Sequence, residues 1–119
     1  MHVGFRLTSA QLENGISVVS LRGDVDPART AEVDHELDAL HGRGVRHVIL
    51  DLLDVPFIET GVLSVLLKHS RRLRIDGGTL ALVIDNEAIA RGVERILGGH
   101  CRIAPTLSEA LDAATAAAS

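Results

Sequence analysis

The sequence predicts an α/β sandwich in which a mixed, mostly parallel β-sheet packs with about four helices. Three observations support this prediction. Segments rich in Val, Ile and Leu alternate along the chain with segments of helical periodicity. An Asn-Gly turn signal near the N-terminus indicates an opening β-hairpin. Glycines follow the helical segments, as is usual where helices end. The expected order is two strands, then alternating helices and strands, ending on a helix.

The N-terminal half supplies the hairpin, one helix and a buried strand. Its expected elements are strands at 3–8 and 16–21 around Asn14-Gly15, a helix from Asp26-Pro27 that ends at Gly42 and Gly44, and a strand at 45–53. Aspartate caps free N–H groups, and proline is tolerated at the first helical position. The 45–53 run is apolar almost throughout, which indicates a central strand covered on both faces.

The C-terminal half continues the alternation. Its expected elements are a helix at 60–75 closed by Gly77-Gly78, a strand at 79–84, a helix at 87–97 stopped by Gly98-Gly99, a strand at 102–104, and a final helix after Thr106. Thr106 and Glu109 have capping-box spacing. We find no repeat or linker, so residues 1–119 are expected to form one domain.

Composition excludes several classes of function. The chain carries a net charge of −4 and has no Trp or Tyr, which argues against a nucleic-acid partner. Residues 1–12 lack the pattern of a signal peptide, and no apolar run approaches the length of a membrane span, so we expect no membrane insertion. The lone Cys101 cannot form an internal disulfide, which favours a reducing, cytoplasmic location.

No catalytic, cofactor or metal motif is present. The histidines lack metal-ligand spacing, and neither a phosphate-binding glycine loop nor a nucleophile elbow occurs. Cys101 follows His100 but is better explained as a small, half-buried hydrophobic residue. Asp51 and Asp54 show no spacing that favours acid-base work over solvation. We therefore predict a protein that is not an enzyme.

Three segments together resemble the STAS domains of bacterial anti-sigma factor antagonists. The segment 51–63 resembles the family's strand, loop and Phe-Met/Ile-Asp-Ser/Thr-Ser/Thr-Gly-Leu helix opening. Residues 21–26 look like its Gly-Glu-Leu-Asp strand end, and residues 77–80 look like its Gly-Gly-x-Leu strand entry. The similarity covers about residues 7–111, and the expected order of elements agrees with that fold.

The resemblance implies a function and a contact surface. In the family, a serine at the start of the second helix is phosphorylated by a partner kinase that is itself the anti-sigma factor. The unmodified domain binds that partner and frees the sigma factor, whereas the modified domain releases it. A phosphate adds about −1.5 to −2 charges, which opposes an apolar or acidic contact. By this resemblance, the partner-binding residues are Asp24, Asp26, Phe57, Ile58, Glu59, Thr60, Gly61, Val62 and Leu63.

The chain departs from the family pattern at the usual phosphate acceptor. Gly61 stands at that position, Glu59 replaces the usual Asp, and Val62 replaces a Gly. A one-residue gap would instead align Thr60 with the acceptor and Gly61 with the family glycine. Either way, Thr60 is the phosphoacceptor candidate, apart from Ser64 one turn further on.

Each of these polar residues also has a purely structural explanation. Thr60 stands where a helix N-cap belongs and can accept a hydrogen bond from the N–H of Val62 or Leu63. Glu59 can complement the helix dipole, and Asp26 can cap the helix that follows it. Structural and partner-binding roles remain open for each residue.

We therefore predict an anti-sigma factor antagonist, a monomer or weak dimer, that binds an ATP-binding anti-sigma factor of the serine-kinase type. Its binding is expected to depend little on phosphorylation, or to be regulated through Thr60. The alternative is a STAS subunit of a membrane ABC-type (lipid) transport complex. A basic stretch at 68–74 and the wide apolar surface at 62–67 would then dock on the transporter, although a solvated basic face and close neighbours explain them as well.

Overall fold

The computed structural model describes residues 4–119. A five-stranded sheet in the order β1-β2-β3-β4-β5 forms the middle layer, and only β1 is antiparallel to its neighbour. The elements are β1 (Arg6–Gln11), β2 (Ile16–Arg22), α1 (Pro27–Gly42), β3 (His47–Asp54), α2 (Thr60–Ile75), β4 (Thr79–Val83), α3 (Glu87–Leu97), a 3-10 turn (Gly98–His100), β5 (Arg102–Ala104) and α4 (Leu107–Ala118). This architecture confirms the predicted α/β sandwich with a mostly parallel sheet.

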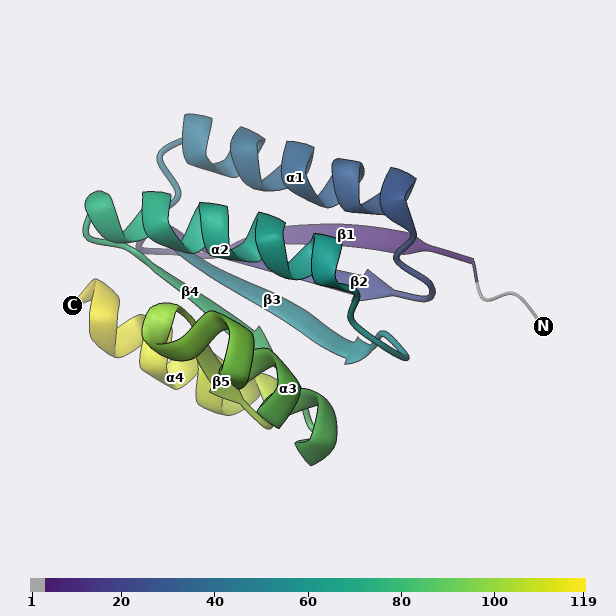
Figure 1. The fold of residues 1–119 in the computed structure, drawn as a ribbon. Helices are drawn as coiled ribbons and strands as arrows, with labels where there is room; N and C mark the ends of the chain where they lie inside the picture. Colours follow the sequence, from purple (N-terminus) through teal and green to yellow (C-terminus); the bar gives the residue numbers. More distant parts are fainter. Residues whose placement is uncertain (1–3) are drawn as a thin grey trace.

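The sheet separates two apolar cores. The larger core contains buried Val and Leu side chains of α1, α2 and α3 packed on one sheet face. The smaller core lies on the other face, where Ala110 and Ala114 of α4 pack against Ile49 and Val83. Figure 1 shows α1 and α2 side by side along the sheet, with α4 at its other face. The small alanines allow α4 to approach the strands closely.

The first strand lies later in the chain than expected. The strand predicted at 3–8 is observed at Arg6–Gln11, and residues 1–3 lie outside the described residues. Asn14 and Gly15 both have positive φ, and Ile16 N–H donates to the Glu13 carbonyl, as in a type I′ turn. This turn sets Gln11 opposite Ser17, so pairing continues through the polar residues at 8–11. These residues are exposed on an edge strand, so they carry no apolar pattern by which the sequence could reveal the strand.

Side-chain caps begin three of the four helices. Asp26 caps α1 by accepting from the Arg29 N–H, and Thr106 caps α4 by accepting from the Glu109 N–H, as the sequence predicts. Asn86 caps α3 by accepting from the Ile89 N–H. The start of α2 differs and is described with the site.

Candidate functional site

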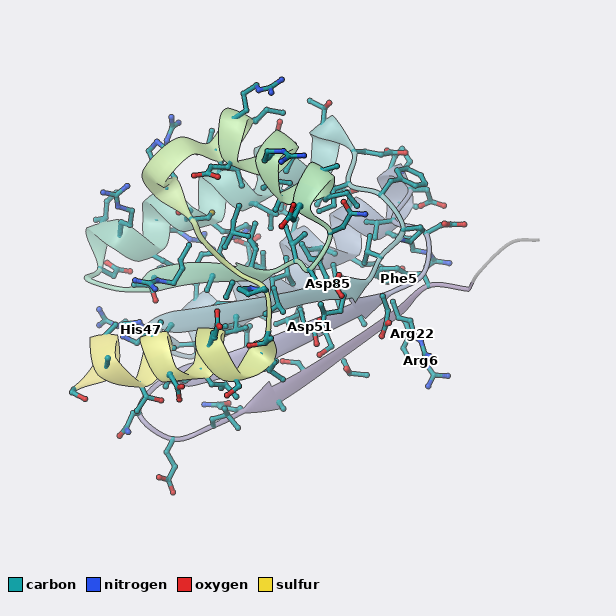
Figure 2. The ribbon with its side chains drawn as sticks, turned by 90° about the horizontal axis from the view of Figure 1, so that it is seen from below. Phe5, Arg6, Arg22, His47, Asp51 and Asp85 are labelled. Carbon is teal, nitrogen blue, oxygen red and sulfur yellow. The ribbon has the colours of Figure 1, made fainter. Side chains whose placement is uncertain are left out.

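The loops that follow β2, β3 and β4 meet at one end of the sheet. Since these strands are parallel, the loops at 23–26, 55–59 and 84–86 all leave from the ends where the strands finish. We call this the carboxyl end of the sheet and the opposite end the amino end. Figure 2 shows Arg6 and Arg22 near the carboxyl end and His47, at the start of β3, near the amino end. The parallel sheet thus brings the sequence-predicted segments at 24–26 and 57–61 to the same end.

A β-bulge shapes the end of β3. Ser20 pairs with Asp51, but Arg22 pairs with Asp54, so β3 contains one residue more than β2 over this stretch. The Asp51 carboxylate accepts a hydrogen bond from the Leu53 N–H at 3.0 Å. Leu53 is exposed and Leu52 is buried. Asp51 therefore has a structural role at the bulge, where it satisfies the Leu53 amide as the strand turns into the loop.

The loop after β3 presents an aromatic side chain. Val55 is buried and anchors the loop, whereas Phe57 is 52% exposed. Ile58 packs partly against the main core. An exposed phenyl ring held by buried neighbours is a usual feature of protein-protein contact surfaces.

A shallow groove of about 200 Å³ lies beside this loop. The residues that line it are Leu52, Leu53, Val55, Pro56, Ile58, Ile84, Asp85, Asn86 and Ile89. The sequence did not indicate the contribution from 84–89, because those residues are distant in the chain and carry no recognised motif. Strand pairing of β3 with β4 brings them to the loop.

Helix α2 begins without a side-chain cap. The N-cap residue is Glu59, not Thr60, and its side chain makes no capping hydrogen bond. The Val62 and Leu63 N–H groups donate to the Glu59 carbonyl, so the predicted cap on these two amides is wrong. The physical reason is that Thr60 is already inside the first helical turn, whereas a capping residue must be extended. The Thr60 hydroxyl is exposed and has no hydrogen-bond partner among residues 4–119.

The next three residues differ sharply in exposure. Gly61 is exposed, and a Cβ at this position would meet no atom within 4 Å. Val62 is 2% exposed and Leu63 is 5% exposed, and both belong to the main core. Their side chains hold α2 on the sheet, so we leave them out of the contact surface that the sequence suggested. Burial also accounts for most of the wide apolar surface of this helix, because Leu66 is buried and Val65 and Leu67 pack against the core.

The loop after β2 completes this end of the molecule. Val25 is buried, Asp24 is half-buried and Asp26 is exposed. Asp26 caps α1, and its carboxylate remains exposed to solvent. Arg6 and Arg22 lie directly opposite each other in the β1-β2 register. Like charges at paired positions disfavour the hairpin, and these residues were not singled out from the sequence.

Comparison with known proteins decides the family. The model of the STAS domain matches residues 8–116, nearly the whole chain. This chain belongs to the STAS domain family. A search of curated protein sequences gave no match.

Solved structures agree with this assignment at the level of the fold. An anti-sigma factor antagonist from Mycobacterium paratuberculosis is 22% identical, with a TM-score of 0.77 over 94% of this chain and 95% of that chain. The anti-sigma factor antagonist SpoIIAA in its unphosphorylated form is 20% identical, with a TM-score of 0.76 over 95% and 97%. A variant of RsbS from Moorella thermoacetica is 20% identical, with a TM-score of 0.77 over 93% and 96%. SpoIIAA from Bacillus also matches in its phosphorylated form.

The basic face of α2 in this STAS domain is largely neutralised by α1. Lys68 Nζ forms an ion pair with Asp34 Oδ1 at 2.6 Å, and Arg72 Nη2 forms an ion pair with Asp38 Oδ1 at 2.7 Å. The Lys68 bond is the main cause that lowers the pKa of the Asp34 carboxyl, and the Arg72 bond does the same for the pKa of Asp38. These pairs join two helices and account for Lys68 and Arg72, which weakens the charge argument for docking this face on an acidic or lipid surface.

A cluster of three side chains that can ligate a metal ion connects α1 and α2. Its ligand atoms, on Asp34, Asp38 and His69, lie within 4.8 Å of one another. Sequence spacing did not reveal this cluster, because its members come from two helices. His69 is buried and donates through Nε2 to Asp34, since the Arg72 guanidinium can only donate and occupies Nδ1 at 3.1 Å. Burial lowers the pKa of His69, which favours the neutral ring. Lys68 and Arg72 already compensate the carboxylates, and the cluster functions as a link between α1 and α2.

Cys101 is buried in the main core, and burial raises the pKa of its thiol. A raised pKa disfavours the reactive thiolate, so the structure supports the packing role expected for this residue.

Within residues 4–119, no helix combines the length and the apolar character that crossing a bilayer requires.

Proposed function

We propose that this STAS domain is an anti-sigma factor antagonist that binds a kinase-type anti-sigma factor through the carboxyl end of its sheet. The proposed contact surface consists of Asp24, Asp26, Phe57, Ile58, Glu59, Thr60 and Gly61. The observation that carries the proposal is the exposed Phe57 beside the uncapped start of α2. Structural neighbours that are anti-sigma factor antagonists support the general role.

We further propose that the usual serine switch is absent and that Thr60 is the position where a phosphate would act. Gly61 offers no hydroxyl, whereas the Thr60 hydroxyl is exposed and uncommitted in the described chain. The first-turn amides of α2 have no side-chain cap, and helix N-termini favour anions. A phosphate on Thr60 would place about two negative charges beside Glu59, in the middle of the contact surface.

The test starts with affinity capture from lysate of the native host, followed by mass spectrometry of the bound proteins. Recovery of an ATP-binding kinase-type anti-sigma factor supports the proposal. Recovery of a membrane ATPase complex without such a kinase contradicts it and supports a transport subunit instead.

The captured kinase then tests the Thr60 switch. Thr60→Glu is expected to weaken binding about tenfold or more, because it adds a charge where the phosphate would lie. Thr60→Val keeps the shape and is expected to bind like the wild type. Equal binding of the glutamate variant, the valine variant and the wild type would exclude Thr60 as a switch while leaving the contact surface intact.

A further inference from the structure

A second feature lies at the amino end of the sheet, away from the proposed contact surface. A cavity of about 300 Å³ opens between the ends of α2 and α4 and the beginnings of β4 and β5. Its polar lining comes from Arg74, Thr79, His100 and Arg102. Its apolar lining includes Ala114 and Ala117 of α4. Figure 1 shows the C-terminal ends of α2 and α4 at this side of the molecule.

The charge of this cavity is unusual for the chain. Carboxylates exceed guanidinium and ammonium groups by four in the whole sequence, yet no lining residue is acidic. Among residues 4–119, neither Arg74 nor Arg102 forms an ion pair with a carboxylate. The arginines of the α1-α2 contact behave differently, since Arg72 is paired with Asp38. Arg74 lies in the last turn of α2, where it complements the helix dipole, but this does not explain Arg102.

Hydrogen bonds orient three of the polar side chains around the cavity, those of Arg74, His100 and Thr79. An Arg74 guanidinium nitrogen lies 3.2 Å from His100 Nδ1, and arginine can only donate, so His100 Nδ1 is the acceptor. With Nδ1 as the acceptor, the imidazole N–H lies on Nε2, which is a donor. The Thr79 hydroxyl is held by His47 Nδ1 at 2.8 Å, and Figure 2 shows His47 at this end of the sheet. The cavity is therefore lined by the guanidinium groups of Arg74 and Arg102 and by the imidazole donor of His100.

We propose that this cavity binds a small phosphomonoester. Arg74 and Arg102 supply charged, forked donors that match phosphate oxygens, and His100 Nε2 supplies a further donor. Ala114, Ala117 and the start of β4 provide an apolar wall for a compact organic group. The volume is at the small end of the range for ligand sites, which excludes a large polymer from the enclosed part. This site is independent of the proposed partner surface.

Phenyl phosphate is the probe, because it joins a dianionic head to a compact ring. Titration into the isotope-labelled full chain, followed by amide chemical shifts, is expected to give saturable changes at residues 79–81, 100–102 and 113–117. A dissociation constant of about 1 mM or below is expected. Arg102→Gln and Arg74→Gln should each weaken binding about tenfold, the loss expected for one charged hydrogen bond.

Arg91→Gln is the matched control, because Arg91 is exposed on α3 and does not line the cavity. It should bind like the wild type. No saturable shift, shifts confined to the carboxyl end of the sheet, or equal affinities of Arg102→Gln and Arg91→Gln would overturn the proposal. Equal affinity for benzoate, a monoanion on the same ring, would overturn the assignment to phosphate.

Phosphatidylcholine vesicles that contain phosphatidic acid distinguish a lipid headgroup from a soluble phosphomonoester as the ligand of this cavity. Co-sedimentation that Arg102→Gln abolishes would assign the site to a lipid headgroup. Phenyl phosphate binding without co-sedimentation would assign it to a soluble phosphomonoester.

Discussion

The most informative single position is Gly61, because the family's usual acceptor hydroxyl is missing there and the backbone leaves room for it. A Cβ would meet no atom within 4 Å, so Gly61→Ser is expected to fold normally. The partner kinase should then phosphorylate the variant and release it. Mass spectrometry of the intact protein after incubation with kinase and ATP measures the modification. Gly61→Ala has no hydroxyl at this position and is the control, since Thr60 is present in both variants. Gly61→Ser should carry one phosphate more than Gly61→Ala, and equal phosphate on both would show that a serine at position 61 is not an acceptor.

Asp26 allows the cap of α1 to be separated from contact with a partner. Asp26→Ala removes the bond to the Arg29 N–H and should lower the free energy of unfolding by about 1 kcal/mol. Asp26→Asn keeps a capping oxygen but loses the charge, so its stability should stay close to that of the wild type. Urea denaturation gives both values. An asparagine variant that is stable but binds the partner weakly would show that the Asp26 charge acts in recognition. An asparagine variant as unstable as the alanine variant would show that the cap depends on this charge.

These residues also show where sequence reasoning succeeded and failed. Asp26 was identified as a cap because Pro27 follows it at the first helical position, and Thr106 because Glu109 stands three residues later, as in a capping box. Thr60 was assigned to the N-cap of α2 on residue type alone, and the helix begins one residue earlier than that role allows. Residue type could not reveal the burial of Val62 and Leu63 either, because burial depends on how α2 lies on the sheet.

The connection between α2 and β4 depends on a close backbone approach at Gly78. A Cβ there would lie 1.9 Å from the Arg46 carbonyl oxygen, and backbone atoms cannot move aside cheaply. Gly78→Ala should therefore lower the free energy of unfolding by about 3 kcal/mol or more. Gly92→Ala, inside α3 with open space around it, should raise stability by about 0.5–1 kcal/mol. Similar denaturation midpoints for the two variants would contradict this account of the connection.

Two buried histidines should make stability depend on pH: His69 in the contact between α1 and α2, and His47 at the start of β3. Burial lowers the pKa of His69 and of His47, so both stay neutral in the folded chain below their ordinary pKa of about 6.5. The unfolded chain then binds more protons, and the free energy of unfolding falls as the pH falls below about 6.5. Asp34 and Asp38 act at lower pH, since their lowered pKa values give stability that is lost only below about 3.9.

Urea denaturation between about pH 8 and 5 measures the histidine contribution. His69→Gln should be less stable at neutral pH, because it disturbs the bonds to Asp34 and Arg72, but its stability should vary less with pH. An unchanged slope in the variant would show that His69 does not carry the effect.

Most elements were predictable, whereas the contacts between distant segments were not. The bounds of α2 and α3 follow from their periodicity and the glycines after them. The first strand was misplaced, because residues 8–11 are exposed on an edge strand and carry no apolar pattern. The α1-α2 ion pairs, the groove at residues 84–89 and the basic cavity all join residues far apart in the chain.

The molecule as a unit has two chemically different ends. The carboxyl end of the sheet presents Phe57, acidic loops and the uncapped start of α2. The amino end presents a cavity lined by two arginines that have no carboxylate partner among residues 4–119. The sheet that separates the two cores also holds these ends apart, so partner binding and phosphate binding can be tested by separate variants.

The central claim is that the carboxyl end binds a kinase-type anti-sigma factor, and Phe57→Ala tests it most directly. Isothermal titration of the captured kinase with this variant should show binding weakened about thirtyfold or more, the loss expected for an aromatic anchor. Ile75→Ala is the control, because Ile75 is an exposed apolar residue far from the proposed contact surface. It is 85% exposed and is the last residue of α2, at the amino end of the sheet. This variant should bind like the wild type. Undiminished binding by Phe57→Ala, or an equal loss in Ile75→Ala, would contradict the proposed contact surface.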